Sequence, residues 1–538
     1  MGEGGVRGEQ WWESLETDAE VRSMAVPLPR AIQVPNIVEA VDLEGSERIV
    51  LDSANAASGA SARADVRGRY SIIAAGLGKA PRIEYHTGDD YVVVKLPDAR
   101  DMPASLSQRV PLAPYGDIWG FVASFHEARQ IEASESTSPP FVGGFMGYIT
   151  YEQGLSDIGI SPGTSRRHHR PDVCLVWVTK SLVVDHLTGI VHIQQLQSRR
   201  LETDTWLEST TAKLMSLLHT FQPKKETPIK PRRLPRSTSI QPPLTHDYEA
   251  KVTLCQEYIA AGESYELCLT DQTTITRARS DAPTPWTLYK SLRTRQPAPF
   301  ASYLRLGAAT LLSASPERFL RYSAAGLCSM RPMKGTVRKS AGGVATLAQA
   351  EAILHVPKEE AENLMIVDLV RHDLHGVCGA GRVRVPELLR VEEYQSVFQM
   401  VTVVEGRLPD HGGARGKRYT GLDVLAASLP PGSMTGAPKR RSCEILRGIE
   451  DGRERGLYSG VVGYMCATGR GDWSVTIRSL FRWDDEQAKP EEGVDAEEAR
   501  EVWRIGAGGA VTILSTAEGE REEMFTKLAG PLRVFADS

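Results

Sequence analysis

The chain has no long hydrophobic run and few cysteines. None of its 538 residues lies in an apolar run of about 18 or more, so no membrane-spanning helix is predicted. The opening residues, "MGEGGVRGEQWWESLE", lack the apolar core of a signal peptide. The seven cysteines are odd in number and form no CxxC pair, which favours buried thiols in a reducing compartment. We therefore expect a cytoplasmic protein without a disulfide framework.

A strong net charge and a dinucleotide motif are also missing. The net charge is −5, so we expect neither a nucleic-acid partner nor a membrane partner. No GxGxxG precedes a predicted helix, and no fixed-period repeat occurs. Cys378 in "GVCGAG" follows a helical pattern and precedes a strand pattern, whereas a nucleophile elbow needs the reverse order. We interpret that segment as a loop and expect no glutaminase site there.

Three regions follow one another along the chain. Residues 223–244 are rich in proline and basic residues and are predicted to be a linker. They separate an N-terminal region, 1–222, from a C-terminal region, 245–530. The first region alternates strand patterns with loops, one of which holds the basic cluster Arg166–Arg170, predicted to be solvated. The second mixes helices with strands. This order favours an α+β fold with large antiparallel sheets. The predicted helices are 245–263 and 358–374, and the predicted strands include 91–96, 173–178, 396–408, 458–467, 472–483 and 502–511.

Two pairs of carboxylates recur at helical spacing. Glu359 and Glu362 project from one helix face, and Glu520 and Glu523 repeat the arrangement near the C-terminus. Carboxylates on two helices suit a Mg²⁺ ion that also binds an anionic substrate. Ordinary exposed helix faces are the alternative.

Other segments suit an anion. Arg478 is predicted on a strand with apolar alternate positions, and a partly buried arginine needs an anionic partner. Gly508 and Gly509 follow a strand pattern, where backbone N–H groups can approach a carboxylate. "PGSMTGAPK" predicts a helix start with Ser433 or Thr435 as a possible cap and Lys439 on its first turn. Such a helix start can bind an anion, although a plain capped helix is equally compatible. Lys334, in the tight turn "RPMKGT", is either a positioned amine or a surface charge.

Taken together, these segments resemble one enzyme family. "LLSASPERFL", "RPMKGT", "KEEAENLMIVDLVRHDL", "PGSMTGAPK", "SGVVGYM", "SVTIRSL", "GAGGAV" and "EREEMFTK" occur in the order typical of chorismate-binding enzymes. The resemblance implies two large antiparallel sheets packed face to face with helices outside. It also implies Mg²⁺ and chorismate. The implied metal residues are Glu359, Glu362, Glu520 and Glu523, and the implied substrate-binding residues are Thr336, Thr435, Lys439, Tyr464, Arg478, Gly508 and Gly509.

The resemblance also favours one reaction within the family. Members that use water carry a lysine where this chain has Glu266, so amination is expected instead. Lys334 matches the lysine of the aminodeoxychorismate synthases, where anthranilate synthases usually have alanine. Lys334 is then the implied nucleophile, and burial is expected to lower its pKa. Glu266 is the second implied catalytic residue, and ammonia from a separate glutaminase subunit is the implied nitrogen source.

Alternatives remain at this point. Anthranilate synthase chemistry is the second prediction, although Gln399 replaces a histidine that the family uses and cannot transfer a proton. His372 is a further departure, in "RHD". A third interpretation is a non-catalytic subunit that binds tryptophan or a partner. Ser53 in "LDSA" resembles part of the family's tryptophan site, with an ordinary strand end as the alternative.

Overall fold

The computed structural model describes most of the chain, and all structural statements below refer to the described residues. These are 19–41, 47–54, 68–96, 106–132, 139–161, 166, 168–199, 205–222, 238–279, 283–339, 343–394, 397–409, 418–486 and 500–535. Most of the predicted linker, 223–237, and of the acidic segment after Glu486 therefore lies outside the described residues. Within them, no helix is long and apolar enough to cross a membrane.

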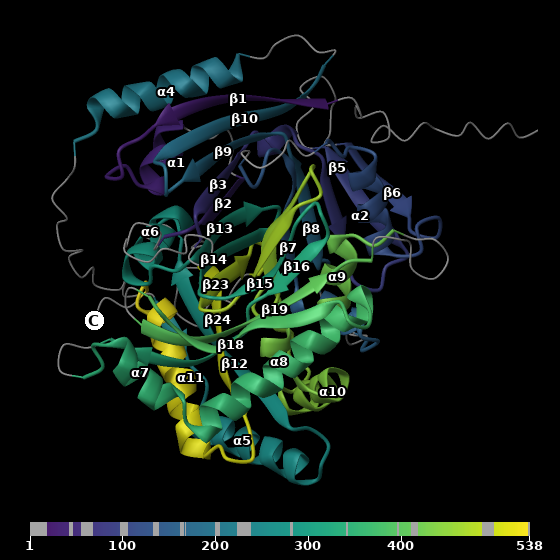
Figure 1. Cartoon of the computed structure of the whole chain (residues 1–538), viewed down its shortest axis with the longest axis vertical. Coiled ribbons are helices and arrows are strands. Elements are labelled where there is room, and N and C mark those ends of the chain that lie inside the picture. The colour runs from purple at the N-terminus through teal and green to yellow at the C-terminus, as the bar shows by residue number, and fades with distance from the viewer. Residues whose placement is uncertain are drawn as a thin grey trace, which may run out of the picture.

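Two antiparallel sheets of 12 strands each form the body of the protein (Figure 1). Sheet A contains, in spatial order, β1 (Ala19–Pro27), β10 (Ile190–Ser198), β9 (Lys180–Asp185), β3 (Tyr70–Ala75), β2 (Arg48–Asp52), β13 (Phe300–Leu306), β14 (Ala309–Ser315), β23 (Ser479–Trp483), β24 (Arg500–Val511), β12 (Glu266–Ala278) and β11 (Ser239–Gln241), with β20 (Gly436–Ala437) beside β12. Sheet B contains β17 (Met333–Arg338), β19 (Val397–Arg407), β16 (Leu327–Met330), β15 (Arg318–Tyr322), β22 (Gly471–Val475), β21 (Val461–Cys466), β7 (Gly144–Ile149), β8 (Val173–Val178), β4 (Arg82–Tyr85), β5 (Tyr91–Leu96) and β6 (Leu106–Pro111), with β18 (Val383–Glu393) beside β19.

Side-chain alternation along the strands builds two cores. Ile49 and Leu311 of sheet A pack with strands of sheet B in the core between the sheets. Their neighbours Val50 and Leu312 point to the opposite face of sheet A and pack against helices. The predicted fold class, two antiparallel sheets packed face to face with helices outside, is confirmed. The helices are α1 (Val34–Val41), α2 (Ile118–Glu127), α3 (Tyr151–Asp157), α4 (Trp206–Thr220), α5 (Thr245–Ala260), α6 (Pro285–Arg295), α7 (Leu347–Leu354), α8 (Pro357–Cys378), α9 (Gly421–Ser428), α10 (Lys439–Ile449) and α11 (Ala517–Leu532).

The N-terminal and C-terminal regions share both sheets. β2 pairs with β13 in sheet A, and β7 pairs with β21 in sheet B. In Figure 1, α4 lies along β1 and β10 at one end, and α5, α8, α10 and α11 lie at the other. The last residues of the predicted linker, Ser239–Gln241, form β11 and pair with β12.

Three local predictions need correction. Residues 472–483 are two strands, β22 in sheet B and β23 in sheet A, because the chain crosses between the sheets after Val475. Cys378 is the last residue of α8 and not part of a loop, although a strand does follow it. Arg166 is not solvated, since it bonds Asp172 and Glu454 and its side chain is 9% exposed.

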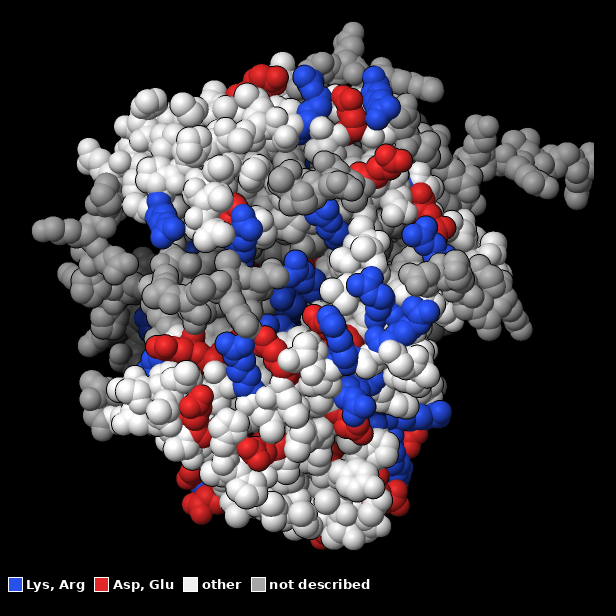
Figure 2. Space-filling model, viewed as in Figure 1, with Lys and Arg blue, Asp and Glu red and all other residues white. Residues whose placement is uncertain are grey.

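Charged side chains are mixed on the face that Figure 2 shows. Lys and Arg side chains lie interspersed with Asp and Glu side chains there, so this face has no large area of one sign.

Candidate active site

A cavity of about 440 Å³ opens where β12, β17, β19 and β24 meet α8 and α11. Its walls combine basic and acidic side chains with backbone from the glycine-rich part of β24. This mixture suits a small ligand that carries negative charge and a polar reacting centre. The charged residues of the walls are Lys334, Arg338, Arg478, Lys527, Glu317, Glu359, Glu362 and Glu523.

Lys334 enters the cavity from a β-bulge. Met333 pairs with Val401 and Thr336 pairs with Gln399, so Lys334 and Gly335 together oppose a single residue of β19. Gly335 has a φ of 76°, which favours glycine. A Cβ at Gly335 would also lie 2.9 Å from Oε2 of Glu359. The bulge therefore requires glycine next to the lysine, and it aims the amine inward.

The amine of Lys334 is paired with Glu266. Nζ donates to Oε1 of Glu266 over 2.9 Å, and the Lys334 side chain is 13% exposed. Burial lowers the pKa of Lys334, but the carboxylates of Glu266 and Glu362 outweigh burial and raise that pKa above its ordinary value. The expectation of a lowered pKa is thus wrong for the resting state. Oε2 of Glu266 is buried and has no hydrogen-bond partner in the described chain, so this carboxylate can accept a proton.

Arg478 owes its position to the crossover between the sheets. It lies between β22 and β23 with a φ of 50°, and its carbonyl accepts from the N–H of Ala314. Among the described residues its guanidinium makes no hydrogen bond or ion pair. Burial and the neighbouring Arg338 lower the pKa of Arg478, as expected for a cation short of counter-charge. The site therefore offers a partly buried arginine to an anion.

The glycine-rich part of β24 presents an open strand edge. β23 pairs with β24 only up to Ile505, and in the described chain no other strand covers that edge beyond it. Gly508 and Gly509 line the cavity there, and the carbonyl of Gly508 accepts from Nζ of Lys527 over 2.9 Å. A Cβ at Gly509 would lie 2.5 Å from Oε2 of Glu520. Glycine thus lets α11 approach the strand.

The predicted metal residues divide into two groups. Glu359 and Glu362 of α8 and Glu523 of α11 line the cavity. Glu520 is buried behind Gly509 and accepts from Ser515. No three His, Cys, Asp or Glu side chains of the described residues lie close enough together to cage an ion. Mg²⁺ commonly takes only one or two carboxylates plus substrate oxygens and waters, so the donor set fits that ion.

Several cavity residues escaped prediction, among them Glu317 and Tyr458. Glu317 lies at the crossover from β14 to β15, is 6% exposed and lines the cavity. Burial raises the pKa of Glu317 to about 7, although Ser433, Lys334 and Lys527 act against the shift. Tyr458 lines the cavity near Arg478, and a Cβ at Gly506 would lie 2.2 Å from its ring. Glu317 lies inside the recognised motif "SASPERFL", and Tyr458 directly precedes "SGVVGYM". Their positions in or next to these motifs could have marked them as site residues.

Three predicted substrate residues lie elsewhere. Tyr464 does not line the cavity, because it sits on β21 and faces a second cavity. The Thr435 side chain is fully buried and donates to the carbonyl of Gly432. Lys439 pairs with Asp373 over 2.7 Å and donates to the Ser428 carbonyl. α10 begins at Lys439 without a side-chain cap, so the predicted capped helix start is also wrong. Thr336 does line the cavity, as predicted.

The two departures from the family pattern differ in importance. His372 is exposed on α8 and does not line the cavity. Gln399 lines the cavity with 5% exposure.

Cys378 is buried, and burial raises the pKa of its thiol, which is the opposite of what a nucleophilic cysteine needs.

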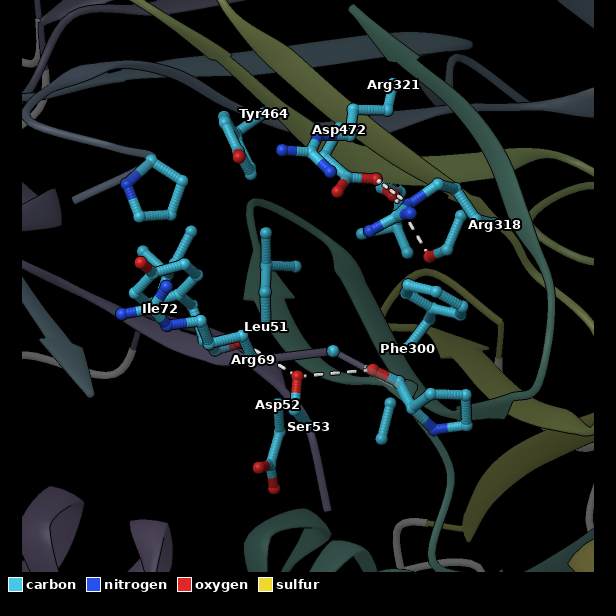
Figure 3. Close-up of a pocket in the computed structure, with 18 residues that line it drawn as sticks. Leu51, Asp52, Ser53, Arg69, Ile72, Phe300, Arg318, Arg321, Tyr464 and Asp472 are labelled. Carbon is cyan, nitrogen blue, oxygen red and sulfur yellow. Dashed lines mark hydrogen bonds and ion pairs between the residues drawn. The ribbon is translucent and has the colours of Figure 1, made fainter. Parts of the chain in front are cut away.

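A second cavity, of about 100 Å³, lies between the sheets (Figure 3). Ser53 lines it just after β2 and donates to the Tyr70 carbonyl over 2.8 Å. Nε of Arg318 donates to Oδ1 of Asp472 over 3.1 Å. Figure 3 shows these two side chains facing one another, with Tyr464 and Phe300 nearby. Ser53 is therefore both a strand end and a cavity residue.

Fold and site define an α+β protein of two antiparallel sheets, with a cavity that holds a paired lysine and other charged side chains. Anthranilate synthase component I from Streptococcus pneumoniae TIGR4 is similar with a TM-score of 0.64 at 22% identity, covering 95% of this chain and 99% of that one. A menaquinone-specific isochorismate synthase from Escherichia coli has a TM-score of 0.60 at 14% identity, covering 97% of each chain. Both share the fold.

Sequence comparison gives the family. Residues 73–533 match the model described as chorismate binding enzyme, and the chain belongs to that family. An aminodeoxychorismate synthase of Saccharomyces cerevisiae is 36% identical over 462 residues, which is 81% of this chain and 54% of that protein. An aminodeoxychorismate synthase component 1 of Klebsiella aerogenes is 33% identical over 72% of this chain and 76% of its own length. The chain spans about half the length of the first curated relatives it matches.

Proposed function

We propose that this chain converts chorismate and ammonia to 4-amino-4-deoxychorismate, the precursor of p-aminobenzoate for folate biosynthesis. The observation that carries the proposal is the partly buried Lys334–Glu266 pair at the wall of the charged cavity. The names of relatives that are 33% and 36% identical support the same reaction.

Substrate binding uses the fixed positive groups of the cavity. Chorismate is a dianion, and Arg478 offers one carboxylate a planar, partly buried guanidinium. The open edge of β24 offers the backbone N–H of Gly508, with Gly509 beside it, and Tyr458 adds a hydroxyl close to Arg478. Lys527 adds positive charge on the other side of that edge.

Lys334 and Glu317 carry the first half of the reaction. Proton transfer from Lys334 to Glu266 leaves a neutral amine, and its nitrogen bonds to a ring carbon while the bond to the allylic hydroxyl breaks. Glu317, protonated near neutral pH, gives its proton to the departing oxygen, which leaves as water.

Ammonia completes the reaction. Its nitrogen attacks the carbon para to the ring carboxylate, the bond to Lys334 breaks, and Lys334 leaves as an amine. The new ammonium gives one proton to the Glu317 carboxylate. Return of the proton from Glu266 to Lys334 restores the resting pair.

Mg²⁺ is the cofactor we propose. Glu362 and Glu523 would hold it, with Glu359 and Glu520 close by, since these side chains belong to the two helices that flank the cavity. When bound, the ion supplies positive charge to one substrate carboxylate.

A glutaminase subunit is the proposed source of ammonia. Relatives named component 1 support a second component, and Cys378 lacks the environment of a glutaminase nucleophile. Ammonium salts should therefore support turnover, whereas glutamine should do so only with a glutaminase present. The expected cytoplasmic location belongs to this proposal, and cell fractionation tests it.

Anthranilate formation is the weaker alternative. That reaction must remove a ring proton and pyruvate, and Gln399 occupies the cavity position where the resemblance expects a histidine. The paired, partly buried Lys334 has no role in it. A non-catalytic binding subunit would have no use for the Lys334–Glu266 pair.

One experiment tests the proposed reaction. Intact-protein mass spectrometry with chorismate and Mg²⁺, but no ammonia, should detect a covalent adduct of the wild type. Lys334→Ala should lose the adduct and most para-amination, and it is expected to gain at most weak ortho-amination. Lys339→Ala is the matched control, because Lys339 lies in the same segment and pairs with Glu393 on the surface. Anthranilate as the main wild-type product, or full para-amination by Lys334→Ala, would refute the proposal.

For the second cavity we propose an amino-acid ligand, with tryptophan as the candidate from the resemblance. Arg318, Asp472 and Ser53 offer groups of both signs and a hydroxyl. The cavity, about 100 Å³, is smaller than the roughly 150 Å³ that accepts benzene elsewhere. Binding of an indole ring therefore requires side chains such as Phe300 to move.

A further inference from the structure

Gln399 holds the bulge that carries Lys334. Its Nε2 donates to the Gly335 carbonyl over 2.8 Å, and its Oε1 accepts from the Thr336 hydroxyl over 2.6 Å. These two residues directly follow Lys334 in β17. One buried side chain therefore ties down both residues on the C-terminal side of the reactive amine.

The bulge needs such a tie because the strand pairing fails there. Between the pairs Met333–Val401 and Thr336–Gln399, β17 contains one residue more than β19. An extra residue leaves backbone groups without ladder partners and bends the strand. Gln399 supplies a side-chain donor in place of a missing backbone donor, so it repairs the ladder at the residue after Lys334.

The orientation of Gln399 follows from strand alternation. Val397 and Gln399 face the cavity, whereas Phe398 and Met400 pack into the small core beneath α7. Those two buried neighbours fix the backbone on either side. The backbone at Gln399 is thus held in place, and the side-chain amide directs its Nε2 and Oε1 atoms toward the bulge.

We propose that Gln399 is a positioning residue that sets how fast Lys334 attacks, through these two hydrogen bonds. This inference rests on the proposed function. An amide suits the task because it combines a donor and an acceptor and has no proton that titrates near neutral pH. A carboxylate would keep the acceptor for Thr336 but would set its second oxygen against the Gly335 carbonyl.

The test separates positioning from folding. Gln399→Met keeps most of the side-chain volume and removes both hydrogen bonds. We expect adduct formation without ammonia to slow by on the order of 10- to 100-fold, with the KM for chorismate changed by less than about twofold. Gln399→Glu retains one hydrogen bond and should slow the adduct less, and it provides the readout if the methionine variant does not fold.

Thr402→Val is the matched control. Thr402 lies on the same strand, but its hydroxyl donates to Oδ1 of Asn363 over 2.7 Å and accepts from the N–H of Leu389, so its side chain does not bond the bulge. It should lower the melting temperature without slowing the adduct. Wild-type adduct rates in both Gln399 variants, or equal slowing in Thr402→Val, would overturn the proposal. Absence of the adduct in the wild type would instead overturn the proposed function on which it rests.

Discussion

Lys334 and Glu317 face one cavity and are both protonated at rest, and their surroundings explain why. Lys334 stays protonated because Glu266 and Glu362 outweigh burial. Glu317 lies where burial raises its pKa to about 7, so it is largely neutral below that pH. The resting site therefore holds one proton to remove from the nucleophile and one to give to the leaving group.

The pKa of Glu317 predicts a pH dependence. The protonated acid is lost as the pH rises through about 7, so kcat for para-amination should fall on the alkaline side of that value. Glu317→Gln should lower kcat by about 10²- to 10⁴-fold, leave KM little changed and abolish the alkaline limb. The measurement is the pH profile of kcat for both proteins. Glu360→Gln, at an exposed position of α8, is the control, and an unchanged limb in Glu317→Gln would contradict the assignment.

At the scale of single residues, the sequence predicted side chains on regular elements better than side chains at crossings. Helical spacing can be recognised in the sequence, and it selected Glu359, Glu362 and Glu523, which line the cavity. Tyr464 and Tyr458 could not be told apart, since the strand pattern around them does not say which sheet face meets a cavity. The raised pKa of Lys334 depends on Glu266, 68 residues away in sequence, and no local pattern reveals that pair.

At the scale of elements, two crossings between the sheets build the reactive centre. The chain passes from β14 in sheet A to β15 in sheet B at Glu317, and from β22 in sheet B to β23 in sheet A at Arg478. The crossings lie side by side, because the Val475 N–H donates to the Glu317 carbonyl. Sequence patterns predicted the second crossing as one continuous strand, since apolar alternation persists through it. A change of sheet leaves no periodic signal.

We predict that carboxylates of α8 and α11 form one Mg²⁺ site. Glu362 of α8 and Glu523 of α11 come from different helices, so Glu362→Gln or Glu523→Gln should each abolish Mg²⁺-dependent turnover and weaken Mg²⁺ binding in calorimetry. The fold should persist, because Glu523 is half exposed. Glu518→Gln, exposed on α11, is the control. Full turnover in EDTA, or in either variant, would rule out the metal site.

At the scale of the whole molecule, the two regions along the chain are interleaved. The composition break at 223–244 is visible in the sequence, but it does not reveal that β2 pairs with β13 or β7 with β21. Such pairings join residues far apart in the chain, and strand patterns say which face is buried without naming the neighbour. The fold class was therefore predictable, while the strand order was not.

The second cavity lies where strands of the N-terminal and C-terminal regions meet. It is lined by β2 and β3 from the N-terminal region and by β13, β15, β21 and β22 from the C-terminal region. A ligand that binds there only in the folded state should stabilise the whole molecule, by ~2.7 kcal/mol at a hundred times its Kd. L-tryptophan should therefore raise the melting temperature, and D-tryptophan should not. Ser53→Leu, which fills the cavity, should remove the shift, whereas Ser23→Leu on the exposed part of β1 should keep it. An equal shift in Ser53→Leu, or none in the wild type at millimolar tryptophan, would show that this cavity does not bind tryptophan.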